Sequence, residues 1–410
     1  MESHPITPAG GQAHALAAPA PAPLRPHWLL KPGTVFLNHG SFGACPKRVL
    51  HRQAELRLAM EAEPVQFLWR WYEQRLEPAR EAVARFVGAR ASDLVFVTNT
   101  TTAINALVRS WPLSAGDGVL TTNLDYNACH NVLIEATRRA GATLQVARIP
   151  FPLAHEDEVV QAVLAAVTPR TRLAMLDHVT SDTALVLPVA RLIRELQSRG
   201  IDTIVDGAHA SGMVPLEMAA LAPAAYAGNL HKWVCAPKGA AFLWVREDRQ
   251  AQLQPSVISH GNNRPRAGYN AFQDRFDWAG TFDPTAWMCA GEALNWMAGL
   301  QPGGWDEIRE RNRALALQAR SLLTRAWDVP APCPEMMIGS MATIPLPARL
   351  QVESAPAKID PDQLRLYDEY AIEVPFNRCG EPARRCVRIS AQLYNHLPEY
   401  AYLAEAIARL

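Results

Sequence analysis

The chain has 410 residues, of which 49% are hydrophobic, and its 40 basic residues balance its 40 acidic residues. A chain of this size and composition can fill the core of two domains, or of one large domain with an appendage. The balanced charge excludes a strong overall field for nucleic acid or an anionic membrane. We therefore expect a soluble globular protein that acts on a small molecule.

The cysteine pattern and the N-terminal segment indicate the compartment. The seven cysteines are odd in number, and no two of them have the spacing of a zinc site or a redox motif. Residues 1–27 are rich in Ala, Pro and Gly, carry no lysine or arginine before Arg25, and read as a disordered tail rather than a signal peptide. No run of about 18 apolar residues occurs. The sequence predicts a cytoplasmic protein without a metal site or a membrane span.

From about residue 93, short β-rich runs alternate with amphipathic stretches of helical length, a pattern typical of βα units around a mainly parallel sheet. No GxGxxG motif follows a strand, which disfavours a dinucleotide site. The expected strands are 93–98, 118–123, 143–149, 172–179, 201–209 and 239–247. The expected helices are 101–111, 127–140 and 189–198.

Beyond residue 283 the alternation fades. Long helical patterns cover 284–300 and 305–327, and strand patterns follow at 341–346, 371–376 and 385–390. The sequence therefore predicts an α/β fold with a large domain at 61–294 and a smaller α+β domain at 295–410. We expect residues 28–60 to pack with the small domain.

A candidate anion site lies where the first strand of the large domain runs into a helix. The strand ends at Thr98 and Asn99, and the helix opens with Thr100 and Thr101. Free N–H groups, the helix dipole and threonine hydroxyls suit a phosphate at such a junction. The alternative is that these residues are ordinary helix caps.

Two polar residues follow a later strand. Asp206 ends the apolar run "TIVD", and His209 stands three residues later. Ligands of open α/β sheets bind at the carboxyl ends of the strands. An aspartate there can hold a positively charged ring nitrogen, and the histidine can reach a neighbouring polar substituent. The alternative is a pair of turn residues with local partners.

Lys232 stands between His231 and Trp233, in a segment that otherwise has the pattern of buried strand and turn. A desolvated lysine has a lowered pKa and can act as a nucleophile that forms a Schiff base. The alternative is an ammonium group that reaches solvent past Trp233.

Phosphate cradle, strand-end aspartate and lysine follow one another in the order of a single cofactor site. The chain resembles the pyridoxal-phosphate (PLP) enzymes of the class V aminotransferase family, which have the fold type I architecture, over nearly all of its length after residue 30. It is most similar to the isopenicillin N epimerase-like branch. The motifs that carry the resemblance are "FLNHGSFG" (36–43), "EPVQF" (63–67), "DHVTS" (177–181), "GNLHKW" (228–233) and "VRISAQLYN" (387–395).

The resemblance implies PLP as the cofactor, bound by the large domain. Lys232 would form the Schiff base with PLP and then move the proton of the substrate Cα. Asp206 would pair with the pyridine nitrogen and keep it protonated, so that the ring withdraws electrons. His209 would lie near the phenolic oxygen of the ring, and Tyr126 would stack on the ring.

The resemblance also assigns the phosphate. Thr100, Thr101 and Asn229 would hold it within one subunit. Thr281, in "AGTFDP", would reach it from the other subunit of a homodimer with shared active sites.

On the substrate side, Arg388 matches the arginine that binds the α-carboxylate, because a guanidinium fork holds a carboxylate through two parallel hydrogen bonds. Asn38 and His39 would line the substrate side; the alternative is a structural turn. Residues 180–181 would contact the far edge of the ring. Ala184 stands where relatives often have glycine.

The reaction stays open at this level because the fold does not choose it. The resemblance favours epimerase, racemase or aminotransferase-type chemistry at Cα, and an epimerase needs a second base, for which His39 and Tyr126 are the candidates. A C–S lyase needs only Lys232. A cysteine desulfurase would use Cys379 as its sulfur acceptor, although the Arg-Thr-Gly-His-His run of those enzymes is absent and a buried inert thiol is the default. A remote alternative is a PLP-binding protein without catalysis.

Overall fold

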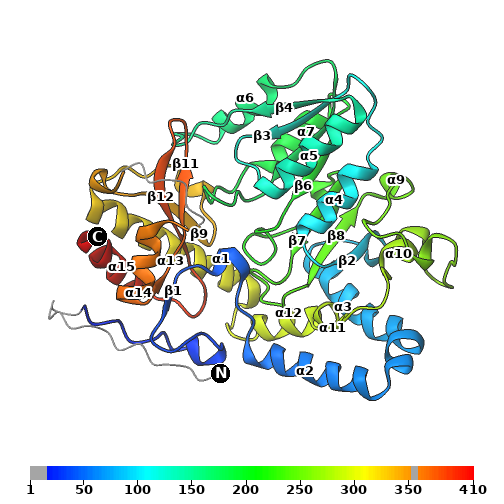
Figure 1. The fold of residues 1–410 in the computed structure, drawn as a ribbon, viewed down its shortest axis with the longest axis horizontal. Coiled ribbons are helices and arrows are strands. Elements are labelled where there is room, and N and C mark those ends of the chain that lie inside the picture. Colours follow the sequence, from blue (N-terminus) through cyan, green and yellow to red (C-terminus); the bar gives the residue numbers. More distant parts are fainter. Residues whose placement is uncertain (1–15, 352–358) are drawn as a thin grey trace, which may run out of the picture.

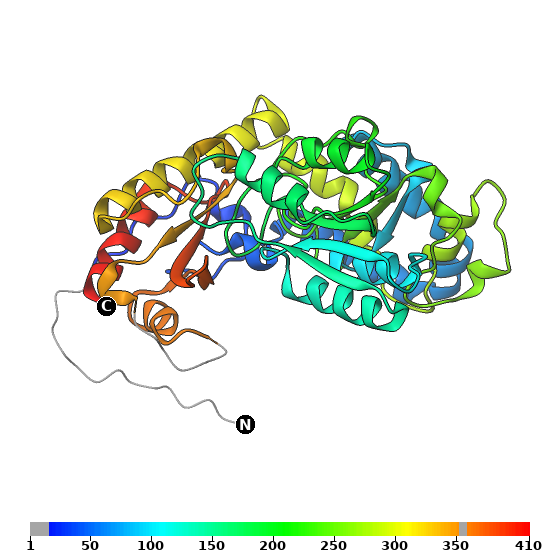
Figure 2. The same cartoon turned by 90° about the horizontal axis from the view of Figure 1, so that it is seen from above.

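The computed structural model describes residues 16–351 and 359–410 (Figure 1). A larger α/β part holds most of the first 300 residues, and a smaller part holds the C-terminal segment together with the chain's N-terminal region (Figures 1 and 2). No helix in the described part of the chain is long and apolar enough to cross a membrane.

The larger part is built on a seven-stranded sheet in the order β2-β8-β7-β6-β5-β3-β4. All neighbouring strands are parallel except at β8, which is antiparallel to both of its neighbours. The mainly parallel α/β sheet predicted from the sequence is confirmed. The strands are β2 (Leu94–Val97), β3 (Gly118–Thr122), β4 (Thr143–Ala147), β5 (Thr171–Asp177), β6 (Asp202–Asp206), β7 (Ala225–Asn229) and β8 (Ala241–Val245).

Helices cover both faces of this sheet (Figure 2). Alternate residues of each strand enter different cores: Leu94 and Phe96 pack with one hydrophobic cluster, and Val95 and Val97 with another. A strand buried on both faces reads as a continuous apolar run, which is why these strands were predictable. One face is covered by α3 (Tyr72–Phe86), α6 (Asp157–Ala165) and α7 (Val189–Gln197), and the other by α4 (Thr100–Ser110), α5 (Asn127–Ala140) and α10 (Ala271–Phe276).

The smaller part contains a three-stranded antiparallel sheet in the order β11-β12-β9. Strand β1 (Val35–Phe36) pairs in parallel with β10 (Ile372–Glu373), so the N-terminal segment lies beside the C-terminal one. The remaining elements are β9 (Met341–Pro345), β11 (Phe376–Cys379), β12 (Arg384–Ser390), α13 (Gly304–Trp327), α14 (Pro361–Tyr370) and α15 (Leu397–Arg409).

The helices at the expected domain boundaries are continuous. Helix α2 (Lys47–Ala62) runs through position 60, and α12 (Ala290–Ala298) runs through position 294. Helix α2 contacts α12 and the short helix α11 (Thr285–Met288), so residues 47–60 lie against these helices rather than against the C-terminal sheet. The division of the chain into domains at these positions stays a prediction.

The expected disordered tail, 1–27, lies outside the described residues as far as residue 15. Within the described part, Arg25–His27 form a 3-10 turn, which corrects the expectation for these residues. The buried Arg25 guanidinium donates to the main-chain carbonyl oxygens of Lys31 and Thr34, at 3.1 and 2.6 Å. The indole ring of Trp28 packs against the Tyr394 ring, with centroids 5.0 Å apart. These contacts order a segment whose composition alone reads as a flexible tail.

Left-handed backbone at two alanines has consequences for stability. Ala184 has a φ of 56° in a buried loop, a conformation that glycine adopts without steric cost. Ala371 has a φ of 53° and caps the C-terminus of α14, where glycine is the preferred residue.

Ala371→Gly should raise the free energy of unfolding by about 1 kcal/mol, because glycine adopts left-handed backbone without the steric cost that an L side chain carries there. The measurement is urea unfolding at equilibrium. Ala54→Gly, at an exposed interior position of α2, is the matched control and should lower the free energy by about 1 kcal/mol. Equal destabilisation by both substitutions would contradict the backbone argument.

Candidate active site

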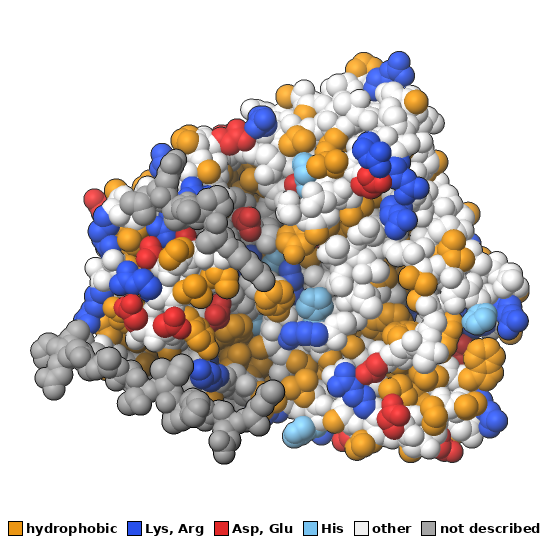
Figure 3. All heavy atoms as spheres, in the orientation of Figure 1, with side chains coloured by type: hydrophobic (Ala, Val, Ile, Leu, Met, Phe, Trp, Pro, Cys, Tyr) orange, Lys and Arg blue, Asp and Glu red, His pale blue; other side chains and the backbone are white. Residues whose placement is uncertain are grey.

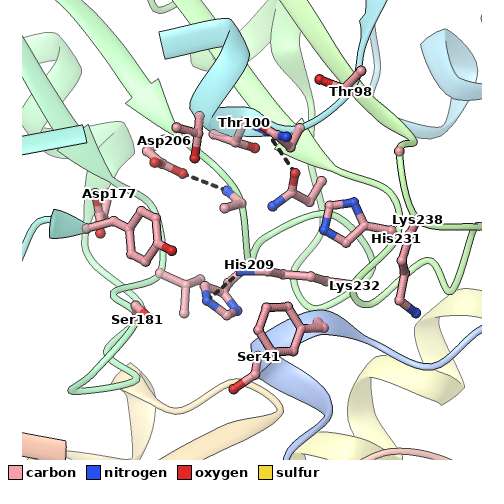
Figure 4. A pocket seen from close by; sticks show the side chains of 18 residues that line it. Ser41, Thr98, Thr100, Asp177, Ser181, Asp206, His209, His231, Lys232 and Lys238 are labelled. Atoms are coloured by element: carbon pink, nitrogen blue, oxygen red, sulfur yellow. Dashed lines mark hydrogen bonds between the residues drawn. The ribbon is translucent and has the colours of Figure 1, made fainter. Parts of the chain in front are cut away.

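The strand ends, the N-terminus of α4 and the short helix α1 (His39–Phe42) enclose a cavity of about 360 Å³ (Figure 4). In the space-filling view the surface is hollowed between the two parts of the molecule, and basic and histidine side chains lie in the hollow (Figure 3). Every residue that the sequence predicts to hold the cofactor lines the cavity except Thr281. Those present are Thr100, Thr101, Tyr126, Asp206, His209, Asn229 and Lys232.

The N-terminus of α4 offers donors at one end of the cavity. The Thr100 N–H donates to Asn229 Oδ1 at 2.9 Å, and the Thr102 N–H donates to the cap residue Asn99 at 2.8 Å. The Thr100 hydroxyl is buried without a hydrogen-bond partner among the described residues, and Thr101 lies beside it. This end of the cavity therefore combines unsatisfied donors with the positive end of a helix dipole, which suits an anion.

Two buried carboxyl groups face the cavity from neighbouring strands (Figure 4). Asp206 on β6 is the register partner of Asp177 on β5. Burial raises the pKa of both, and the neighbouring Asp206 raises that of Asp177 further. Asp206 accepts from the Ala208 N–H at 2.9 Å and from the Cys129 thiol at 3.2 Å, whereas Asp177 Oδ1 has no partner among the described residues. The two donors favour the charged form of Asp206, whereas Asp177 Oδ1 lacks such a donor in the described part of the chain.

Sequence reasoning did not find Asp177 or Cys129. Asp177 has the same signal as Asp206, because it ends an apolar strand of the same sheet. Cys129 lies in the first turn of α5, and nothing in the sequence shows that its thiol meets Asp206.

Lys232 lies in the loop between β7 and β8, and its Nζ atom is 3.0 Å from His209 Nε2 (Figure 4). Burial, and secondarily the positive charge of Arg388, lower the pKa of Lys232 to about 8. Burial and the charge of Lys232 hold the pKa of His209 well below its usual value. The His209 ring is therefore neutral, and its buried Nδ1 has no partner within the described ranges. The site holds a lysine that readily becomes a neutral amine.

Arg388 on β12 lies behind two serines of the cavity wall. Its Nη1 atom donates to the carbonyl oxygen of Ser181 at 2.8 Å, and its Nη2 atom donates to the Ser41 hydroxyl at 2.9 Å. The side chain is buried and Nε has no partner among the described residues. The Asp182 carboxylate acts on Arg388 electrostatically but forms no direct ion pair with it, so donors of the guanidinium remain for a bound carboxylate.

His39 does not line the cavity, which corrects the expectation that it lies on the substrate side. The ring is fully buried, with Nδ1 2.6 Å from the Tyr394 hydroxyl and Nε2 2.9 Å from the main-chain oxygen of Lys232. Burial lowers the pKa of His39 to about 3. Both ring nitrogens lie within hydrogen-bond distance of other groups, which disfavours His39 as the second base. Asn38 likewise does not line the cavity; its Oδ1 accepts from the Ser41 hydroxyl at 2.5 Å.

The other expected residues are placed as follows. Tyr126 lines the cavity and is 48% exposed. Thr281 is exposed and lies outside the cavity of its own chain. Ser181 lines the cavity, whereas Thr180 is buried behind it and its hydroxyl pairs with that of Thr183 at 2.7 Å.

Cys379 is buried in β11, where its thiol contacts the main-chain oxygen of Asp182 at 3.6 Å. The neighbouring Cys386 thiol and burial raise the pKa of Cys379. A reactive sulfur acceptor needs an accessible thiol with a lowered pKa. The structure therefore favours the inert buried thiol over the sulfur acceptor.

Comparison with known proteins adds to this geometry. The Aminotransferase class-V family model matches residues 43–346. Isopenicillin N epimerase of Amycolatopsis lactamdurans is 36% identical over 411 residues, covering 96% of this chain and 100% of the relative. Putative L-cysteine desulfhydrase 1 of Oryza sativa subsp. japonica is 31% identical over 415 residues, covering 92% of this chain and 83% of the relative. The crystal structure of cysteine desulfurase CsdA from Escherichia coli has the same fold, with a TM-score of 0.76 at 21% identity, covering 94% of this chain and 97% of that one.

The fold is shared with PLP-dependent enzymes of known structure. The chain belongs to the class V aminotransferase family, as its motifs indicated. The cavity fits the cofactor, because the unpartnered Thr100 hydroxyl at the N-terminus of α4 suits a phosphate, and the unpartnered Nδ1 of His209 and the Asp206 carboxyl group suit the polar groups of a pyridine ring.

Borohydride reduction of the protein loaded with PLP should fix the cofactor on Lys232, and its uptake should rise with pH around a midpoint near 8, where the buried amine loses its proton. Mass spectrometry of the reduced protein measures this. Lys232→Ala should abolish fixation, and Lys238→Ala, which removes another lysine of the same cavity, should retain it. Fixation that persists in Lys232→Ala would show the assignment to be wrong.

The buried histidines predict acid sensitivity. Burial lowers the pKa of His39 to about 3 and that of His178 to about 4. An unfolded histidine titrates near 6.5, so between these values the unfolded chain binds more protons than the folded one. Stability present above pH 6.5 is lost as the pH falls, by on the order of 2 kcal/mol per histidine between pH 7 and pH 5.

Urea unfolding at pH 7 and pH 5 measures this loss. Replacing the exposed His51 with asparagine should leave the pH dependence as it is in the wild type. The buried carboxyl groups, whose pKa values are raised, act in the opposite direction, so the effect of one ring is taken from the comparison of His178→Asn with the wild type. A loss between pH 7 and pH 5 that is as large in His178→Asn as in the wild type would contradict the buried neutral state of that ring.

Proposed function

We propose that the protein is a PLP-dependent enzyme that removes the Cα proton of an amino acid, with Lys232 as the base. The observation that carries this proposal is the placement of an amine with a pKa of about 8 in the same buried region as an arginine that is bonded to two serines of the cavity wall and forms no direct ion pair within the described ranges. A neutral amine can accept a proton near neutral pH, and the arginine can hold the carboxylate of the substrate.

Four groups of the chain would hold the cofactor. When bound, PLP supplies an electron-withdrawing ring that acidifies the Cα–H bond of an amino acid. Thr100, Thr101 and Asn229 would bind the phosphate, since their donors lie at the N-terminus of α4. Asp206 would pair with the ring nitrogen, because its two oxygens already accept hydrogen bonds that stabilise the charged form. His209 would face the phenolic oxygen and Tyr126 the face of the ring.

Arg388 would orient the substrate. In the structure its guanidinium bonds to Ser41 and to Ser181, both of which line the cavity. A substrate carboxylate would take over these donors and neutralise the buried charge. Fixing the carboxylate fixes which bond at Cα lies against the Lys232 amine.

Epimerisation at Cα is the first candidate reaction. It is supported by the 36% identity to isopenicillin N epimerase of Amycolatopsis lactamdurans over the full length of that relative. An epimerase returns the proton on the opposite face and needs a second acid. His39 is buried outside the cavity and both its ring nitrogens have partners. Tyr126, the other candidate for this acid from the sequence, lines the cavity.

Elimination of sulfur from a cysteine-like substrate is the second candidate. It needs Lys232 alone, and it is supported by the 31% identity to the putative desulfhydrase of rice. Transfer of sulfur to Cys379 is disfavoured, since that thiol is buried and held in the protonated form.

We also propose that the active protein is a cytoplasmic homodimer. Thr281 is exposed on its own subunit, which leaves its hydroxyl available to the cavity of a second copy. Phe42, at the cavity mouth, is 75% exposed, and Ile258 is 66% exposed; apolar surface of this kind suits a subunit contact. All seven cysteines are free, as a reducing compartment requires.

Proton NMR of the protein with PLP and a panel of amino acids in heavy water tests the reaction. The panel includes cysteine, its S-conjugates and branched or peptide-like amino acids. We expect loss of the Cα proton signal for a substrate, with no exchange in Lys232→Ala. Inversion at Cα without a new product supports epimerisation, and pyruvate from cysteine supports elimination.

Other products would contradict parts of this proposal. Alanine from cysteine would indicate a desulfurase and would require Cys379 to become accessible. Cα exchange that persists in Lys232→Ala, or no exchange for any amino acid of the panel with the loaded wild type, would contradict the proposal as a whole.

A further inference from the structure

The catalytic loop is held from behind by the N-terminal segment 38–43. A side chain at Gly43 would meet the His231 carbonyl oxygen at 2.0 Å and Lys232 Cα at 2.9 Å, so the two main chains are in direct contact there. Lys238 Nζ donates to the Gly43 carbonyl oxygen at 2.9 Å. The His39 ring packs on the Trp233 ring with centroids 4.8 Å apart. These contacts fix the position of the segment relative to Lys232.

The Lys232 carbonyl oxygen lies 2.9 Å from His39 Nε2 and can only accept, so we place the proton of the neutral ring on Nε2. The Gln392 amide nitrogen lies 3.3 Å from the same ring nitrogen, a longer contact that this tautomer leaves without a hydrogen bond. Nδ1 then carries the lone pair and accepts from the Tyr394 hydroxyl at 2.6 Å. Tyr394 is fully buried and lies after β12. The ring is thus held at one end by the C-terminal region and holds the lysine main chain at the other.

The same segment reaches the substrate-binding arginine. Ser41 accepts from Arg388 Nη2 at 2.9 Å, and Asn38 Oδ1 lies 3.4 Å from the same nitrogen. His39 stands between these two residues in the chain. The segment 38–43 therefore contacts Arg388 through Ser41 and the main chain of Lys232 through His39.

We propose that His39 is a positioning residue for Lys232: it donates to the Lys232 main-chain oxygen, is fixed by Tyr394, and keeps the lysine amine in its desolvated place relative to Arg388. This inference rests on the proposed role of Lys232 as the base. His39 is fully buried and does not line the cavity, so this role acts through the main chain of Lys232.

The pKa of Lys232 reports this position, because burial and Arg388 are the two main causes that lower it. A loop that relaxes would move the amine toward water and toward the ordinary pKa of lysine. The titratable groups that act on the Lys232 amine are Arg388, Asp206, Asp177, Cys129 and the neighbouring His209. Those that act on the His39 ring are Lys238, Lys232 and His231, with the Tyr394 hydroxyl in direct contact.

The test compares two substitutions of one residue. In His39→Gln the amide nitrogen can take the place of Nε2 and still donate to Lys232, whereas in His39→Asn the side chain is too short. The measurement is the pH dependence of the rate at which the cofactor-free protein forms a borohydride-reducible adduct with PLP. We expect the midpoint to rise by on the order of one pH unit in His39→Asn, and to stay within a few tenths of a unit of wild type in His39→Gln.

If a His39 variant does not fold, Tyr394→Phe tests the same proposal. The pH midpoint of adduct formation should rise in Tyr394→Phe, but by less than in His39→Asn. His178→Asn is the matched control, since His178 is a second buried histidine whose Nδ1 lies 2.9 Å from a tyrosine hydroxyl, that of Tyr226. It should lower the thermal unfolding temperature without moving the midpoint.

The possible results distinguish the positioning role of His39 from the proposed function of Lys232. A wild type that forms its adduct on Lys232, with a midpoint unchanged in His39→Asn and Tyr394→Phe, overturns this inference alone. So does a shift in His39→Gln as large as that in His39→Asn, because it would assign the effect to ring volume rather than to the donor. A wild type without an adduct overturns the proposed function and this inference together.

Discussion

The site depends on one constraint: Lys232 and Arg388 are buried in the same region, where burial and the charge of Arg388 both lower the pKa of Lys232. Two cations are placed in one buried region, and no described carboxylate forms an ion pair with either of them. An arginine does not lose its proton in a protein, so the lysine is the partner that becomes neutral. The arginine stays charged, with the Asp182 carboxylate as an electrostatic partner that does not contact it directly, and a substrate carboxylate can bind its donors. One electrostatic arrangement therefore prepares both the base and the binding site.

The sheet places the remaining polar groups around these two cations. Strands β5, β6 and β7 end side by side, and each end or the loop after it contributes a side chain: Asp177, Asp206 and Lys232. Strand β2 runs parallel to β7, so it ends at the same edge of the sheet, and α4, which follows it, presents its N-terminus to the cavity. The charges of the site are thus spread over separate elements, which keeps the anion site apart from the carboxyl pair.

Much of this was predictable because the signal is local. Strands buried on both faces read as apolar runs, and a polar residue that ends such a run, like Asp206, points to the site. Helix α6 and the role of Asp177 were missed, although their signals were of the same kind. His39 could not be placed from its sequence context, because its partner Tyr394 stands 355 positions later in the chain. Burial against a distant residue is decided by tertiary packing, and the motif around His39 shows only that the segment matters.

The parallel pairing of β1 with β10 has a consequence for how the molecule assembles. It joins Val35 to Ile372, so nearly the whole chain forms the connection between two neighbouring strands. Contacts between residues so far apart form late, since the closure of a long loop is unfavourable until other elements bring its ends together. During synthesis the N-terminal segment must wait without its strand partner while the seven-stranded sheet forms. The loop between β7 and β8, which carries Lys232 and packs against the segment 38–43, gains these contacts only when the last part of the chain has folded.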